Sequence, residues 1–238
     1  MPDILFEDNH LLAINKRAGD LSQPDAGGDD PLQTIISAFI KKRDSKPGNV
    51  YLGTLHRLDR PVTGALLFAK TSKAAARMAE MIRNRTFHKY YLAVTPTQDF
   101  LSDTWTKCED NLYRDGDITR VVAKNNPGDK GVLYIRRLVA GKNFSLTLIK
   151  LETGRKHQIR AQLSFRKMPI VGDKKYGSTV PLGDGIALHA YFISFEHPVK
   201  KMVTEISAPL PRSIITLLQS DGITIPDDRT LIEACHSF

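Results

Sequence analysis

The sequence predicts an α+β fold with a mixed, largely antiparallel sheet. Strand-like apolar runs separated by polar, glycine-bearing turns fill residues 90–151. Helical periodicity is confined to a few segments, and strands cluster in runs between them. Because strands and helices do not alternate regularly, a parallel α/β sheet is disfavoured.

In the first third of the chain, short apolar runs at residues 4–6 and 11–14 predict two strands joined by a tight turn. A surface loop rich in glycine and acidic residues is expected over residues 19–31. Apolar residues at helical spacing predict a helix from Leu32, with the basic residues 41–43 at its end. The segments after it are expected to be an extended polar stretch, a Pro/Gly bend and a buried strand, at residues 51–59, 60–64 and 65–69.

The clearest helix should follow a cap at Thr71 and Ser72. Four apolar side chains are spaced to share one of its faces: Ala75, Met78, Ala79 and Ile82. Strands are expected at residues 90–94, 132–135, 144–151 and 187–195, with a helix at 157–166. Residues 221–238 are predicted only as a surface segment.

Composition narrows the class of protein. The chain has 238 residues, and 34 Lys and Arg against 26 Asp and Glu give a net charge of +8. This balance favours an acidic partner such as nucleic acid, although bulk charge alone gives only even odds. Cys108 and Cys235 lie far apart in the sequence, which argues against a disulfide framework or a zinc knuckle. We expect a cytoplasmic protein with no membrane segment, because neither an export signal nor a long apolar stretch is found.

The first candidate for chemistry is the segment from His56 to Arg60. It places Asp59 near Arg57 and beside Arg60, just before the Pro/Gly bend. Neighbouring guanidiniums favour the ionised acid, which suits nucleophilic or base chemistry. A structural ion pair at a strand end is the alternative, and the segment alone favours it by about two to one.

Two further segments carry polar groups. Residues 153–160 follow a strand, open a helix, and offer Arg155, Lys156 and backbone N–H groups to a phosphate. A solvated basic turn is the alternative. Adjacent Tyr90 and Tyr91 must point to opposite faces of a strand, so only one can line a given cleft. Each taken alone is more simply a core tyrosine.

These residues closely resemble the signature of RluA-type RNA pseudouridine synthases, which is carried by His56–Arg60 and Thr63–Lys70. The resemblance covers nearly the whole chain. Further matching segments are Ile4–Gly19, Lys89–Ala93, Leu151–Gln162, Gly172–Gly177 and Leu188–Ala190. It implies a bent, antiparallel-rich sheet flanked by helices, in a single catalytic domain spanning residues 1–238, with no N-terminal S4-type module.

The resemblance also implies roles for individual residues. Asp59 would be the catalytic aspartate, Tyr91 would lie beneath the uracil, and Arg160 would pair with the aspartate. Substrate-binding roles are expected for Arg57, Arg60, Arg155, Lys156, His157 and, as an apolar wall of the uracil pocket, Leu188. The expected partner is structured RNA, ribosomal or transfer, bound by a monomer with no cofactor and no metal. Basic clusters at residues 41–43, 83–89, 155–160 and 166–175 are candidates for phosphate contacts.

Two positions depart from the family pattern. Arg17 stands where a Lys-Pro-x-Gly turn has proline, and Val62 where the bend after Asp59 has a hydroxyl residue. Two routes stay open for the aspartate, attack on the sugar or base and removal of a ribose proton. The rival functions are a non-catalytic RNA-binding factor with this fold and a hydrolase that uses Asp59 with His56 or His189.

Overall fold

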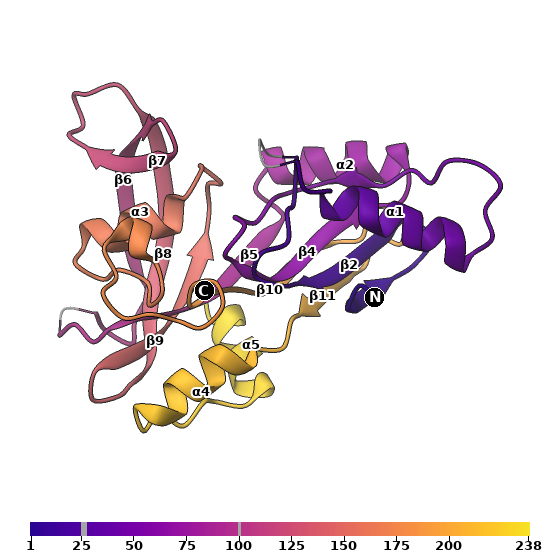
Figure 1. Cartoon of the computed structure of the whole chain (residues 1–238). Coiled ribbons are helices and arrows are strands. Elements are labelled where there is room, and N and C mark those ends of the chain that lie inside the picture. The colour runs from indigo at the N-terminus through magenta and orange to yellow at the C-terminus, as the bar shows by residue number, and fades with distance from the viewer. Residues whose placement is uncertain (25–27, 100) are drawn as a thin grey trace. The chain divides into compact units, whose positions relative to one another are not determined.

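The computed structural model describes residues 1–24, 28–99 and 101–238, so residues 25–27 of the predicted loop lie outside it. The chain forms two compact units. The first unit contains residues 1–88 and 190–209, and the second contains residues 89–189 and 210–238. The predicted α+β class is confirmed, and strands and helices occur in both units (Figure 1).

The first unit is built on strands in the order β1-β2-β4-β10, with β3 paired to β4 and β11 to β10. The pairs β1–β2, β2–β4, β3–β4 and β10–β11 are antiparallel, as predicted for this sheet. The bounds are β1 Ile4–Glu7, β2 Leu11–Lys16, α1 Leu32–Arg43, β3 Gly53–Thr54, β4 Thr63–Ala69, α2 Ser72–Arg83, β10 Leu188–Glu196 and β11 Val203–Ser207.

Helix α2 covers one face of this sheet. Thr71 caps the helix, since its side chain accepts a hydrogen bond of 3.1 Å from Ala74 N–H. Ala74 and Met78 are buried against Leu11, Leu67 and other apolar strand residues. The predicted helix is confirmed, but its predicted face is partly wrong, because Ala79 is exposed and Ala74 is buried in its place.

Strand β4 starts at Thr63, two residues earlier than predicted, because Gly64 allows the strand to pass close to β10. A Cβ atom on Gly64 would lie 2.3 Å from the carbonyl oxygen of Ala190, and its φ is +112°. Only glycine fits such a close backbone approach at positive φ. The bend expected at residues 60–64 therefore ends before Thr63, and β4 is buried along its whole length.

The second unit has strands in the order β5-β9-β8-β6-β7, and their pairings are antiparallel. This confirms the strand-rich prediction for residues 90–151. The bounds are β5 His88–Pro96, β6 Thr106–Asp115, β7 Ile118–Val122, β8 Asp129–Ala140, β9 Phe144–Leu151, α3 Gln158–Phe165, a 3-10 turn Lys174–Tyr176, α4 Arg212–Ser220 and α5 Asp228–His236.

The C-terminal segment is not merely a surface segment, so that prediction is wrong. Helix α5 buries Leu231, Ala234 and Cys235. The Asp221 carboxylate accepts backbone N–H bonds from Asn143 and Phe144 at 2.8–3.1 Å, which fixes the turn before β9. Apolar residues at helical spacing were present, but a nine-residue helix gave too short a pattern to separate from a loop.

Candidate active site

Backbone groups of the segment that carries Asp59 are hydrogen-bonded to other parts of the first unit. Asp59 is half-buried in the turn before β4. The Ser22 hydroxyl accepts a hydrogen bond from Leu58 N–H at 3.1 Å and donates one to the Leu58 carbonyl at 2.9 Å. Val62 N–H donates to the Asp59 carbonyl at 3.0 Å. These bonds fix the direction in which the Asp59 side chain leaves the chain.

Lys16, to which the sequence assigned no role, is a second support of this segment. Its ammonium is buried and donates to the carbonyls of Arg17, Arg60 and Val62 at 2.9, 3.0 and 2.7 Å. Burial lowers the pKa of Lys16 to about 8, while the carboxylates of Asp20 and Asp59 act in the opposite direction. A buried cation thus lies within electrostatic reach of Asp59.

The two arginines nearest Asp59 in the sequence lie at the surface. Arg57 and Arg60 are exposed, and the Arg60 guanidinium lies 2.7 Å from the Asp29 carboxylate. Both partners of that ion pair are at least half exposed, so the pair adds little stability and can exchange for another anion. His56 has a different role, because its Nε2 accepts a hydrogen bond from Leu67 N–H at 3.1 Å. This nitrogen is therefore occupied, which weakens the hydrolase alternative.

In the second unit, Arg160 on α3 lies in a buried and rigid setting. Its Nε and Nη2 atoms donate to the two carboxylate oxygens of Asp173 at 2.7 and 2.9 Å. Both side chains are at most 5% exposed. The guanidinium also lies 4.9 Å from the ring centroid of Tyr176. A bidentate ion pair together with a ring contact fixes the plane of a guanidinium.

Tyr176 connects Arg160 to His157. The Tyr176 hydroxyl accepts a hydrogen bond from Thr119 N–H at 2.9 Å and lies 3.0 Å from His157 Nδ1. His157 has a φ of 53°, a left-handed backbone conformation that costs free energy for residues other than glycine. The predicted substrate-binding residue His157 is therefore directed toward Tyr176 at the start of α3.

The other predicted phosphate ligands of this segment are paired with exposed acids. Arg155 lies 3.4 Å from Asp129, and Lys156 lies 3.1 Å from Asp117. Since Asp129 and Asp117 are 65% and 84% exposed, these are weak surface pairs that a phosphate can replace. The backbone N–H of Arg155 donates to the Gln158 side chain at 3.1 Å, so this predicted phosphate donor is already capped.

Tyr91 and Leu188 are both buried, on β5 and at the start of β10. Tyr90 is buried as well, and the two tyrosines pair with different residues of β9, Tyr90 with Lys150 and Tyr91 with Ile149. Asp59 belongs to the first unit, whereas Tyr91 and Arg160 belong to the second. Their meeting around one uridine stays a prediction.

Asp173 and Tyr176 were missed as site residues, although a signal for them existed. Both lie in the segment from Gly172 to Gly177 that resembles the family pattern, yet their types alone did not reveal a contact with Arg160. No three His, Cys, Asp or Glu side chains within residues 1–24, 28–99 and 101–238 are grouped to hold a metal ion. Over the same residues, no helix is long and apolar enough to cross a membrane.

Comparison with known proteins identifies the family of this chain. The model of the RNA pseudouridylate synthase family matches residues 10–165, which include Asp59, Tyr91 and Arg160. The chain belongs to this family. As a member, it is an RNA pseudouridine synthase of the RluA type, and RNA is its class of substrate.

Relatives in bacteria cover most of this pseudouridine synthase. Ribosomal large subunit pseudouridine synthase D of Xylella fastidiosa (strain Temecula1) is 31% identical over 91% of this chain and 68% of its own. An uncharacterized RNA pseudouridine synthase of Bacillus subtilis (strain 168) is 29% identical over 92% of this chain and 72% of its own. Among solved structures, human RNA pseudouridylate synthase domain containing 4 shares the fold, with a TM-score of 0.78 and 22% identity over 94% of this chain and 95% of that one.

Proposed function

We propose that this pseudouridine synthase converts specific uridines of structured RNA to pseudouridine with Asp59 as the catalytic residue. The observation that carries the proposal is the setting of Asp59. Its carboxylate leaves a turn fixed by Ser22 and by the buried ammonium of Lys16. A carboxylate placed so firmly is suited to nucleophilic or base chemistry.

In the reaction, the N1–C1′ bond of a uridine breaks, the base turns, and a C5–C1′ bond forms, while C5 loses its proton to water and N1 takes up a proton from water. Asp59 would start it by forming a bond to the nucleotide that breaks again as the product forms, or by removing a ribose proton that is later returned. Arg160, fixed by Asp173, would stabilise negative charge at Asp59, and Tyr91 would pack beneath the uracil. No cofactor or metal is needed in this sequence of steps.

The target base must leave its stack before it can react, at a cost of about a few kcal/mol. We propose that the exposed side chains of Arg57, Arg60 and Arg155, together with the half-buried Lys156, hold the phosphates around it. The side chain of Leu188 would form an apolar wall of the uracil pocket. The two units would then work as one catalytic domain, as a monomer in the cytoplasm.

Ribosomal RNA is the substrate we favour over transfer RNA, because the relative from Xylella fastidiosa is named for the large ribosomal subunit. The test is tritium release from RNA labelled at uridine C5, with ribosomal and transfer RNA compared side by side and the pseudouridines mapped. Release from ribosomal RNA at one or a few positions is expected. Release from neither RNA would contradict the proposal, and release from transfer RNA alone would correct the substrate.

A non-catalytic RNA-binding factor is the second function considered. The same experiment separates it, because such a factor binds the labelled RNA and releases no tritium. The buried pairing of Arg160 with Asp173 favours the enzyme, since a surface that only binds phosphate has no need of a buried, oriented guanidinium.

A further inference from the structure

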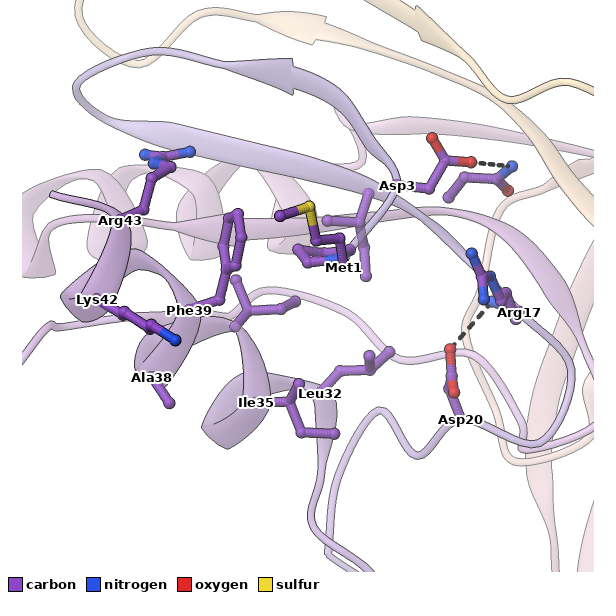
Figure 2. A pocket seen from close by; sticks show the side chains of 14 residues that line it. Met1, Asp3, Arg17, Asp20, Leu32, Ile35, Ala38, Phe39, Lys42 and Arg43 are labelled. Carbon is purple, nitrogen blue, oxygen red and sulfur yellow. Dashed lines mark hydrogen bonds between the residues drawn. The ribbon is translucent and has the colours of Figure 1, made fainter.

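A hollow of about 890 Å³ opens in the first unit beside α1 and the start of β1 (Figure 2). Most of its lining is apolar. Ile35 on α1 is 48% exposed and Met1 is fully exposed, while Leu32 and Ile36 are buried at its floor. The helical spacing predicted that the apolar residues of α1 share one face. Part of that face is exposed in the structure. Exposed apolar surface with a polar rim is typical of binding sites. We call this hollow the α1 pocket.

Phe39 is the aromatic side chain of the α1 pocket, and one of its neighbours holds it in place. The Arg43 guanidinium lies 5.5 Å from the Phe39 ring centroid. Arg43 is itself fixed by two hydrogen bonds of 2.7 Å to Glu7, and the contacts with Arg43 and Lys70 lower the pKa of Glu7 to about 2. The ring therefore offers a preformed flat surface beside Met1 and Ile35, as Figure 2 shows.

The charges at the rim favour an anionic ligand. Within the described part of the chain, no carboxylate pairs with the side chain of Arg17 or Lys42. The two acids of the lining accept hydrogen bonds from neutral N–H groups. Asp3 accepts from Asn15 Nδ2 at 3.1 Å, and Asp20 accepts from Arg17 N–H at 3.3 Å. Among the described lining residues, the side chains of Arg17 and Lys42 thus remain available to an anion, and Lys42 is the one drawn near Phe39 in Figure 2.

The α1 pocket is also attached to the Asp59 segment. Its lining residues Arg17 and Asp20 belong to the turn after β2, where Gly19 N–H donates to the Arg60 carbonyl at 2.9 Å. Lys16, the residue before Arg17, holds the carbonyls of Arg60 and Val62. The edge of the α1 pocket formed by Arg17 and Asp20 is thus connected by backbone hydrogen bonds to the segment that carries Asp59.

We propose that the α1 pocket binds an unpaired nucleobase of the substrate RNA, one that lies outside the modified uridine itself. The base would stack on Phe39, and the neighbouring phosphates would contact Arg17 and Lys42. This rests on the proposed function only in taking RNA as the substrate. An acidic peptide would meet the same cations, but the flat ring and the attachment to the Asp59 segment favour RNA.

The first test measures RNA affinity in matched variants, with Asp59→Asn present in every protein so that no turnover occurs. Phe39→Leu keeps an apolar side chain but removes the stacking surface, and we expect affinity to fall about tenfold. The matched control is Phe165→Leu, because Phe165 is 59% exposed, also lies near an arginine, and is outside the pocket. Likewise Lys42→Gln should weaken binding more than Lys41→Gln.

The second test identifies the base. Single abasic nucleotides are placed in turn through the substrate RNA. Each RNA is bound to the protein that retains Phe39 and to the Phe39→Leu variant, after thermal unfolding has shown both proteins to be equally folded. At one position, loss of the base should weaken RNA binding by the protein that retains Phe39. With RNA that lacks this base, the Phe39→Leu variant should bind as tightly as the protein that retains Phe39.

Two results would overturn the proposal. One is equal affinity of the Phe39→Leu and Phe165→Leu variants for intact RNA. The other is that, at every abasic position, the loss of affinity caused by the missing base adds to the loss caused by Phe39→Leu. Either result is expected of a pocket that docks a protein. A wild-type enzyme without turnover would refute the proposed function and leave these binding results standing.

Discussion

The supports seen around Asp59 and Arg160 are of different kinds. Asp59 is half-buried, and the contacts that fix its segment are made by backbone groups with Lys16 and Ser22. Arg160 is buried, and its guanidinium is fixed directly by the side chains of Asp173 and Tyr176. A change near Asp59 therefore alters a loop, whereas a change near Arg160 alters one guanidinium.

The difference separates two kinds of effect on the enzyme. Loss of a support near Asp59 should change stability and turnover together, because the turn and the carboxylate move as one. Loss of a support near Arg160 should act through the orientation of a single charge. The two kinds of effect can be separated by measuring single-turnover rate, RNA affinity and unfolding on the same variants.

The largest effect within this comparison is expected for Arg160→Lys. A lysine keeps the charge but cannot reproduce the two parallel bonds to Asp173, so the single-turnover rate should fall on the order of 100-fold. RNA affinity should change much less. Tritium release under single-turnover conditions measures the rate, and a rate within about threefold of the wild type would remove Arg160 from its proposed role.

Asp173→Asn should lower the rate by about tenfold or more, because one buried charge partner of Arg160 is lost. The matched control is Asp110→Asn, which alters the pair of Asp110 with Arg166, 2.7 Å apart in the same unit. In the Arg160→Lys variant, adding Asp173→Asn should lower the single-turnover rate little further. If the two fold-reductions in rate multiply instead, Asp173 does not act through Arg160.

The contribution of Lys16 to the Asp59 segment should depend on pH, and the Lys16→Met variant tests this. The pKa of Lys16 is about 8 in the folded protein against an ordinary value of 10.5, so between these values the unfolded chain holds a proton that the folded chain has lost. The free energy of unfolding of the wild type should therefore rise by about 1–3 kcal/mol relative to Lys16→Met from pH 8 to 10.5.

Turnover should respond in the opposite direction. A neutral amine has two N–H donors for three carbonyls, so the single-turnover rate of the wild type should fall above about pH 8. The Lys16→Met variant should lack this decline. Chemical denaturation and tritium release at each pH test both statements, and parallel pH profiles for the two proteins would refute them.

The smallest effect is expected for Ser22→Ala. Removal of the hydroxyl leaves the N–H and carbonyl of Leu58 without this partner, at a cost of about 1 kcal/mol in the free energy of unfolding. The rate should fall only a few-fold, in step with that loss. If the free energy of unfolding falls by this amount while the rate is unchanged, the hydrogen bonds of Ser22 do not influence the position of Asp59.

The sequence predicted the strands and longer helices well because their periodicity is local. It named Asp59, Tyr91 and Arg160 only through resemblance to a family. It missed Lys16 and Asp173, since a lysine at the end of a strand and an aspartate in a loop show no local sign that they are buried and paired. It also misjudged residues 221–238, whose burial depends on contacts with β9 and its neighbours.

The claim on which the account depends is that the carboxylate of Asp59 carries the reaction. The most direct measurement is single-turnover tritium release by Asp59→Asn, with RNA binding and thermal unfolding followed on the same sample. We expect no detectable release from a folded variant that binds RNA as tightly as the wild type. Release at a rate near that of the wild type would contradict the account.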